Sequence, residues 1–194
     1  MTDITAPSIA VALVITPLTC SRAGGEDNIP ELSVKATLDP SAPKPVTVLT
    51  WSTIFNPCLA LKRRNFAAQD ISQEPPTTIK LEISKGPKRA GFQRNRGSSD
   101  EKYYMTLQPG QEITAAIHPF DVIKRVRNNA FVFEAGHSYR LELSEEGEKV
   151  STWWWGTTND VLNEVGRPPK DISGIRGVGE IVLSMEPVTF QIAE

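Results

Sequence analysis

The sequence predicts an all-β fold, an antiparallel β-sandwich with one short helix near Thr158–Val165. Two observations support this prediction. About ten short runs have the alternating or β-branched character of strands, and turn residues separate them. The 15 prolines and 13 glycines interrupt the chain too often for long helices. The helical content is also too small, and comes too late in the chain, for a fold of alternating strands and helices.

The segment Lys102–Asp121 is the clearest strand–turn–strand pattern in the chain. Apolar residues occupy every second position before and after the turn, which is the spacing of a strand with one buried face. Pro109 and Gly110 between the two runs suit a type II turn. From this and the other alternating runs we expect five side chains to be buried: Leu81, Met105, Ile117, Leu141 and Leu183.

Residues Ile9–Thr16 are expected to form the first strand, buried on both faces. The alternative is that Ser8–Thr19 is the apolar core of a signal peptide, with SRA at 21–23 as a cleavage site. The preceding residues carry Asp3 and no Lys or Arg, and Pro17 interrupts the run, so the strand is favoured. A cytoplasmic protein is then expected, and a secreted one if Ser8–Thr19 is a signal core. No apolar run reaches the roughly 20 residues of a membrane span, so no membrane partner is expected.

Most of the remaining strands follow from alternation or from β-branched and aromatic content. They are Leu32–Leu38, Val46–Trp51, Phe66–Ile71, Thr77–Ile83, Ser138–Leu143, Val150–Trp155 and Glu180–Ile192, the last interrupted at Pro187. Val150–Trp155 is expected to return after a hairpin turn around Gly147. Leu59–Asn65 could form either a helical turn or a short edge strand. The short helix would have Thr158 or Asn159 as its cap and Gly166 as its terminator.

Length and composition are those of an ordinary globular protein: 194 residues, 39% hydrophobic and 23% charged. All-β folds often reach about 200 residues as one unit, so residues 1–194 are expected to form a single domain. The formal net charge of −2 gives no overall attraction to nucleic acid or to an anionic membrane. Nucleic acid is therefore not expected as a partner.

Four stretches together carry a resemblance to a known family: VTVLTWSTIFN (46–56), GPKRAGF (86–92), YYMTLQPGQEITAAI (103–117) and AGHSYRLEL (135–143). They resemble the Ig-like β-sandwich of the non-catalytic N-terminal domain of fungal deuterolysin-type metalloproteases, and related stand-alone fungal proteins of unknown role. The resemblance covers roughly Val34–Leu143, about half of the chain. It implies an Ig-like sandwich and a role as a protease inhibitor or prodomain-like chaperone. The chain has no His-Glu-x-x-His zinc helix, which the family's catalytic half carries, so peptidase chemistry is not implied.

The residue types that usually build catalytic or metal sites are few and scattered. A zinc site needs three or four His, Cys or carboxylate ligands, usually with two of them close in sequence. His118 and His137 are far apart, and so are Cys20 and Cys58, so we assign no metal, no cofactor and no catalytic residue. A G-x-S-x-G nucleophile motif is also missing. Cys20 and Cys58 could form one disulfide or remain free thiols.

One candidate binding site is a basic loop that has Phe92 at its centre and no acidic residue. Its members are Lys85, Lys88, Arg89, Arg94 and Arg96. They could bind an anionic partner such as phosphate, nucleic acid or an acidic protein face. The plainer interpretation, which is favoured, is a solvated loop whose charges are neutralised by Asp100 and Glu101.

The second candidate is the aromatic run of Trp153, Trp154 and Trp155. In a strand, Trp153 and Trp155 share one face and Trp154 takes the other. One face must enter the core. The other face is either covered by Thr158–Gly179, which is favoured, or exposed as an aromatic platform for a sugar ring or a protein partner.

Three functions remain open on these observations. The first, which is preferred, is a non-catalytic Ig-like binding domain with a protein partner of unknown identity or an anionic ligand. The second is a protease regulator, and the third is a protein or enzyme that binds a small ligand or carbohydrate in a pocket near Trp153–Trp155. A charged loop face would favour the first and a protruding loop with an apolar tip the second. A concave pocket beside exposed tryptophans would favour the third.

Overall fold

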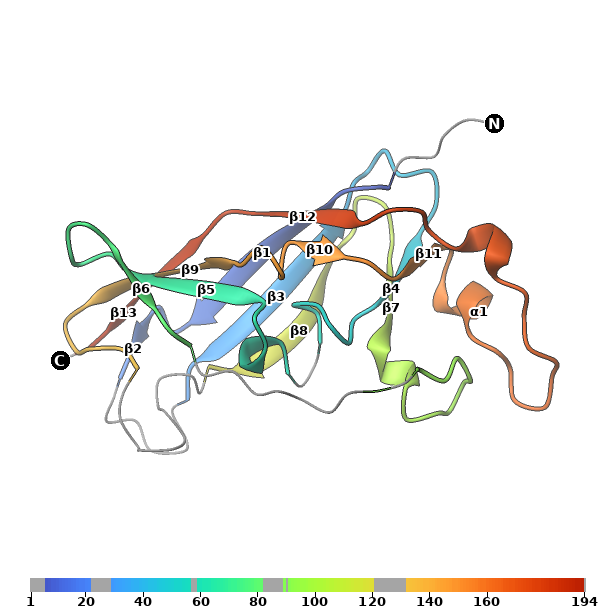
Figure 1. Ribbon diagram of the computed structural model, residues 1–194, viewed down its shortest axis with the longest axis horizontal. Helices are drawn as coiled ribbons and strands as arrows, with labels where there is room; N and C mark the ends of the chain where they lie inside the picture. Colours follow the sequence, from blue (N-terminus) through green and yellow to red (C-terminus); the bar gives the residue numbers. More distant parts are fainter. Residues whose placement is uncertain are drawn as a thin grey trace.

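The computed structural model contains three β-sheets, and it describes residues 6–21, 29–56, 59–81, 89, 91–120 and 132–193 (Figure 1). The first sheet has the strand order β10 (Lys149–Val150), β12 (Ile181–Met185), β1 (Ile9–Thr16), β3 (Glu31–Leu38), β8 (Glu112–Pro119). The second has the order β11 (Trp153–Trp155), β4 (Val46–Leu49), β7 (Tyr104–Leu107). The third has the order β2 (Thr19–Cys20), β13 (Val188–Ile192), β9 (Ser138–Leu143), β5 (Phe66–Asp70), β6 (Thr77–Ile79).

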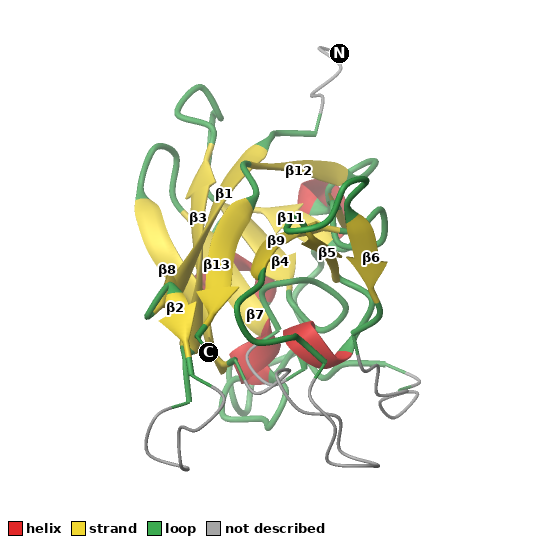
Figure 2. Ribbon diagram, turned by 90° about the vertical axis from the view of Figure 1, so that its left-hand side faces the viewer, coloured by secondary structure: helices red, strands yellow, loops and turns green. Residues whose placement is uncertain are grey.

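The sheets face one another across a shared core. Seen edge-on, β1, β3 and β8 lie in one layer, and β4, β5 and β9 lie across from them (Figure 2). One continuous cluster of buried side chains takes Leu32 from the first sheet, Val48 from the second, and Leu141 and Phe190 from the third. The prediction of an all-β sandwich is therefore confirmed.

Helical structure is minor in the described part of the chain. It consists of α1 (Thr158–Val161) and of 3₁₀ turns at Ala60–Lys62, Glu101–Tyr103 and Ser173–Ile175. None of these helices is long and apolar enough to cross a membrane. The 3₁₀ turn at Ala60–Lys62 decides the alternative left open for Leu59–Asn65 in favour of a helical turn.

Strand β1 forms where the sequence predicts it, at Ile9–Thr16, but only one of its faces is buried. Its residues alternate between buried and exposed along the whole strand. Strand β4, by contrast, is buried on both faces, since Val46, Thr47 and Val48 are all buried. Thr47 is satisfied there because its hydroxyl donates to the carbonyl of Gly156, at 2.8 Å. Polar strand residues can thus be buried where the chain that covers them supplies an acceptor.

Two of the strand pairings are parallel, whereas the sequence predicts an antiparallel sandwich. Strand β1 pairs in parallel with β12, and β13 pairs in parallel with β2. The predicted interruption of Glu180–Ile192 at Pro187 is confirmed, since β12 ends before this proline and β13 begins after it. The break lets the two halves of this segment join different sheets.

The prediction that Ile117 is buried is wrong, because β8 contains a β-bulge. The neighbouring strand pairs with Thr114 and then with Ala116, so Ala115 has no residue opposite it. An extra residue reverses the facing of the side chains beyond it. Ala116 and His118 are therefore buried, and Ile117 is 52% exposed. Of the other side chains predicted to be buried, Met105 is only partly buried. The remaining three are buried: Leu81, Leu141 and Leu183.

The turn at Pro109 and Gly110 has the expected geometry, but it does not join two paired strands. Gly110 has a φ of 71°, and the N–H of Gln111 donates to the carbonyl of Gln108 at 3.2 Å. These are the features of a type II turn. Strand β7 pairs with β4, however, and β8 pairs with β3, so the turn carries the chain from the second sheet to the first.

The predicted return strand Val150–Trp155 is likewise divided. Its first part, β10, pairs with β12, and its second part, β11, pairs with β4. Neither part pairs with β9, so the hairpin expected around Gly147 is not formed. The turn at 145–148 instead leads the chain out of the third sheet.

Helix α1 is shorter than the predicted Thr158–Val165, and its cap is Thr157 rather than Thr158 or Asn159. The carboxylate of Asp160 accepts hydrogen bonds from the N–H of Thr157 at 2.8 Å and from its hydroxyl at 2.9 Å. These bonds lower the pKa of Asp160. The helix ends because Leu162 turns to extended backbone and is buried beside Trp154, well before the predicted terminator Gly166.

Candidate functional site

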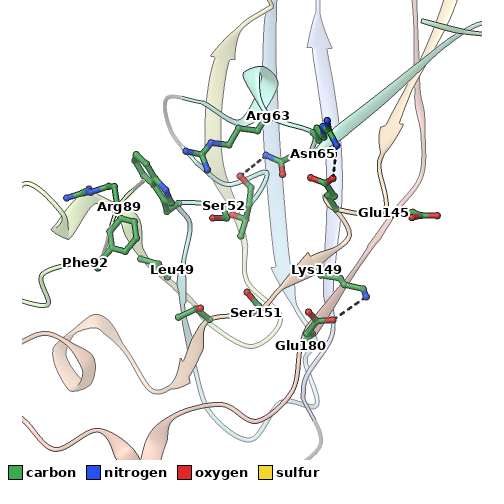
Figure 3. Close-up of a pocket in the computed structure, with 16 residues that line it drawn as sticks. Leu49, Ser52, Arg63, Asn65, Arg89, Phe92, Glu145, Lys149, Ser151 and Glu180 are labelled. Atoms are coloured by element: carbon green, nitrogen blue, oxygen red, sulfur yellow. Dashed lines mark hydrogen bonds and ion pairs between the residues drawn. The ribbon is translucent and has the colours of Figure 1, made fainter. Parts of the chain in front are cut away.

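A cleft of about 750 Å³ opens where β4 ends, between the chain around Trp51 and the turn at 145–149. One side carries Arg63, Arg89 and Phe92, and the other carries Glu145, Lys149 and Glu180 (Figure 3). Volumes of this size are typical of sites for small ligands and short segments. We refer to it as the Trp51 cleft.

Trp51 is half-buried and belongs to a group of three aromatic rings. Its ring centroid lies 4.9 Å from that of Tyr103 and 5.4 Å from that of Phe92, in an edge-on and a tilted arrangement. Phe92 and Tyr103 are 5.9 Å apart, also edge-on. Such arrangements are favoured by the charge distribution of aromatic rings and hold the indole in one orientation.

Two arginines lie over this aromatic group. The guanidinium carbon of Arg63 is 4.7 Å from the Trp51 ring centroid, and that of Arg89 is 5.3 Å from it. Arg89 is also 4.7 Å from the centroid of Phe92. Each distance is within the range of a cation–π contact. The aromatic wall of the cleft is therefore also its positively charged wall.

Buried amide side chains position Trp51 and Arg63. Asn56 donates from its amide nitrogen to the carbonyl of Trp51 at 2.6 Å. Asn65 donates to two backbone carbonyls of the same segment, at 3.2 and 3.3 Å. Because this stretch is outside the sheets, its buried carbonyls need side-chain donors in place of ladder hydrogen bonds. The cleft wall is thus a fixed structure.

The carboxylate of Asp100 holds the loop that carries Arg89 and Phe92. Asp100 is almost fully buried; it lies 2.7 Å from a guanidinium nitrogen of Arg89 and accepts from the N–H of Gln93 at 2.9 Å. The hydrogen bond from Gln93 and, after it, the contacts with Arg89 lower the pKa of Asp100, although burial opposes this. Asp100 therefore neutralises the charge of Arg89, while the guanidinium plane of Arg89 lies over the rings of Trp51 and Phe92.

The opposite side of the cleft carries alternating charges. Arg64 lies 3.7 Å from Glu146. Lys149 lies 3.2 Å from Glu180 (Figure 3). Glu145 is exposed beside them. With both pairs formed, this side keeps one surplus charge, on the carboxylate of Glu145.

Part of the predicted basic loop lies in this cleft. Arg89 lines it, whereas Lys85 and Lys88 are outside the described residues. The sequence pattern groups these three with Arg94 and Arg96 as one anion-binding set. The structure brings Arg89 together with Trp51 and Arg63 instead, two residues that no sequence pattern selects.

The other arginines of the loop contact α1. Arg96 donates to the side chain of Asn159 and lies 3.6 Å from Glu101. Arg94 makes a long contact of 3.4 Å with the carbonyl of Val161. The described arginines of the loop thus contact different parts of the domain. Asp100 and Glu101, the partners expected in the plainer interpretation, pair with Arg89 and Arg96.

The three consecutive tryptophans do not form an exposed platform. Trp153 and Trp154 are buried, and Trp155 is half-buried with its ring 5.2 Å from that of Trp153. The connector after α1 covers them: the indole N–H of Trp153 donates to Gly179, and a Cβ at Gly177 would lie 2.1 Å from the Trp153 ring. The platform interpretation is corrected, since the covered alternative is the one observed.

The histidines and cysteines also serve the interior or its edge. The thiol of Cys20 is free and buried, and burial raises its pKa to about 11. Cys58 is outside the described residues. His118 is buried, and the Nδ1 atom of His137 lies 2.7 Å from the buried carboxylate of Asp70. Within the described ranges, no three His, Cys, Asp or Glu side chains are placed to hold a metal ion.

Comparisons of the chain with family models, with curated proteins and with solved structures gave no match. The resemblance to fungal metalloprotease domains therefore stays a prediction. The case for a functional site depends on the cleft alone.

Proposed function

We propose that this chain is a non-catalytic binding domain whose ligand occupies the Trp51 cleft. The observation that supports this most directly is the half-buried Trp51 indole, which lines a concave surface under two guanidiniums. Tryptophan and arginine dominate the binding energy of many protein interfaces, because they bury a large area with little loss of conformational freedom. The Trp51 ring, held in one orientation in the cleft, can contribute to ligand binding in the same way.

The side chains of the cleft favour recognition over catalysis. Its described lining has no His or Cys, and both Glu146 and Glu180 are paired with cations. A general acid or base must be positioned to exchange a proton with the substrate, and a nucleophile needs an adjacent base. The lining supplies stacking, positive charge and hydrogen-bond donors, which hold a ligand without changing it.

The favoured ligand is a short segment of a protein. A volume of about 750 Å³ suits a few residues of an extended peptide rather than a folded surface. The Ig-like assignment and the protease-regulator role stay predictions, because nothing in the cleft distinguishes a protease from another partner.

Panning a random peptide library against the immobilised full chain tests the proposal. We expect the selected peptides to share a motif and to lose affinity by at least about tenfold for the Trp51→Ala variant, since stacking and shape at the cleft are removed. Ile117→Ser, on an exposed β8 position whose strand partner Ser33 is also outside the cleft lining, serves as the control and should bind normally. Amide spectra of both variants would check that they are folded.

Two results would contradict the proposal. One is a set of peptides that binds Trp51→Ala and Phe92→Ala as tightly as the parent chain. The other is a failure to enrich any motif over repeated rounds.

A further inference from the structure

We propose that Arg63 is the recognition group of the Trp51 cleft and that it binds one carboxylate of a peptide ligand. The carboxylate would come either from a Glu or Asp side chain or from the end of a chain. This inference rests on the proposed function and adds to it the chemistry of the ligand. Three features of Arg63 lead to it: its unanswered charge, its unsatisfied nitrogen and its contact with Trp51.

The guanidinium of Arg63 forms no ion pair with any carboxylate of the described residues. The other cations that line the cleft each have a partner: Arg64 has Glu146, Arg89 has Asp100 and Lys149 has Glu180. The guanidinium of Arg63 has no carboxylate partner among the described residues, and its described contact is the cation–π contact with the Trp51 ring. After these pairs are formed, the positive wall keeps one surplus charge, and it is located on Arg63.

The Nε atom of Arg63 is buried and has no hydrogen-bond acceptor among the described residues. A buried donor without an acceptor is destabilising, and the ring contact supplies no acceptor for an N–H in the guanidinium plane. A ligand oxygen completes it if the guanidinium turns on the Trp51 ring so that Nε–H faces the cleft. A carboxylate matches this geometry, because its two oxygens accept from Nε–H and a neighbouring N–H in parallel.

The remaining charges of the cleft favour a single carboxylate over a polyanion. On the far side Glu146 and Glu180 are paired with Arg64 and Lys149, and Glu145 keeps a negative charge, so a second acidic group of the ligand would meet no free cation there. A ligand with a single negative charge, bound at Arg63, and an uncharged neighbouring group packed on Trp51 avoids the Glu145 carboxylate. Ligand selectivity then comes from the contrast between the two sides of the cleft.

Small carboxylate compounds test the inference on the full chain by titration, with the Arg63 Nε–H and Trp51 indole N–H resonances as the readout. N-acetyl-glutamate α-amide represents an internal acidic residue, and N-acetyl-glycine represents a chain end. N-acetyl-glutamine α-amide is the neutral match, and inorganic phosphate represents a polyanion. We expect at least one of the two carboxylates to shift both resonances in a saturable way, more strongly than glutamine or phosphate. Whichever carboxylate binds more tightly identifies the source.

The variants Arg63→Gln and Arg64→Gln provide a matched pair from adjacent positions. Arg63→Gln should weaken carboxylate binding, read at Trp51, by about tenfold or more, whereas Arg64→Gln should leave it within about twofold. Equal shifts from glutamine and glutamate would overturn the inference while leaving a binding cleft in place. Preferred binding of phosphate, or unchanged binding by Arg63→Gln, would also overturn it. Failure of the proposed function would be seen in a different experiment: peptide panning would then select no peptide whose binding depends on Trp51.

Discussion

Gly147 lies directly against the backbone of Asn65. A Cβ atom built on Gly147 would be 1.9 Å from the carbonyl oxygen of Asn65, which is far inside van der Waals contact. The same carbonyl accepts a hydrogen bond from the N–H of Ser144 at 3.1 Å. This approach joins the two sides of the Trp51 cleft, since Asn65 is two residues after Arg63 and Gly147 directly follows Glu146.

The close approach predicts that Gly147→Ala destabilises the protein by more than about 2 kcal/mol, because backbone must move to admit the methyl group. Chemical denaturation measures the change. Gly174→Ala is the matched control: a Cβ at this position would have no atom within 4 Å, so the effect should stay within about 0.5 kcal/mol. Equal effects of the two substitutions would mean that the approach of Gly147 to Asn65 is looser than described.

The bulge in β8 predicts opposite outcomes for the same substitution at two strand isoleucines. Ile117→Thr should change the free energy of unfolding by less than about 0.5 kcal/mol, because the side chain is 52% exposed. Ile15→Thr should cost about 1–3 kcal/mol, because residue 15 is only 2% exposed and its new hydroxyl would be buried. Threonine keeps the β-branch, so strand propensity hardly changes. A larger loss at Ile117 than at Ile15 would contradict the bulge.

These two isoleucines also show how far sequence reasoning reaches. Apolar content locates Ile9–Thr16, and alternation locates Ser138–Leu143, both with the bounds observed. Alternation has a limit, however. It does not reveal a bulge, because an inserted residue leaves no compositional signal and reverses the pattern only relative to a partner strand. Pairing is also hidden: β7 and β8 adjoin in sequence but join different sheets through contacts that depend on distant residues.

The environment of Asp100 predicts a loss of stability in acid. The pKa of Asp100 is lower in the folded protein than in the unfolded chain. Its contribution to the free energy of unfolding is therefore fully present above the ordinary aspartate pKa of about 4, and it is lost as the pH falls through the lower folded value. The unfolding free energy of the parent chain should therefore fall more steeply below about pH 4 than that of Asp100→Asn. Denaturation at a series of acidic pH values measures both slopes. Equal slopes would mean that the Gln93 and Arg89 contacts do not favour the ionised form.

The thiol of Cys20 should react slowly with alkylating reagents. Its pKa is raised from 9.0 to about 11, so at pH 8 it has about a hundredfold less thiolate than an ordinary cysteine. A Cys58→Ser background leaves this single thiol, and its rate with iodoacetamide can be compared before and after denaturation. Equal rates in the two states would contradict the burial of Cys20.

The candidate site was harder to predict than the fold. The basic loop and the tryptophan run are conspicuous in the sequence, yet Trp153 and Trp154 are core residues and Arg96 binds α1. Trp51 and Arg63 carry no local motif. They meet because a turn stabilised by buried amides brings them together. Arg89 joins them from a loop 38 residues after Trp51 and 26 after Arg63.

Hydrogen exchange of the full chain with and without a selected peptide tests the location of the binding surface most directly. If the ligand occupies the Trp51 cleft, amides in residues 50–56, 59–65 and 91–93 should become more protected, and the strands β1, β3 and β8 should exchange as before. The exposed side chains of Val14 and Ile117 offer the competing surface on those strands. Protection confined to β1, β3 and β8, with the cleft segments unchanged, would contradict the account.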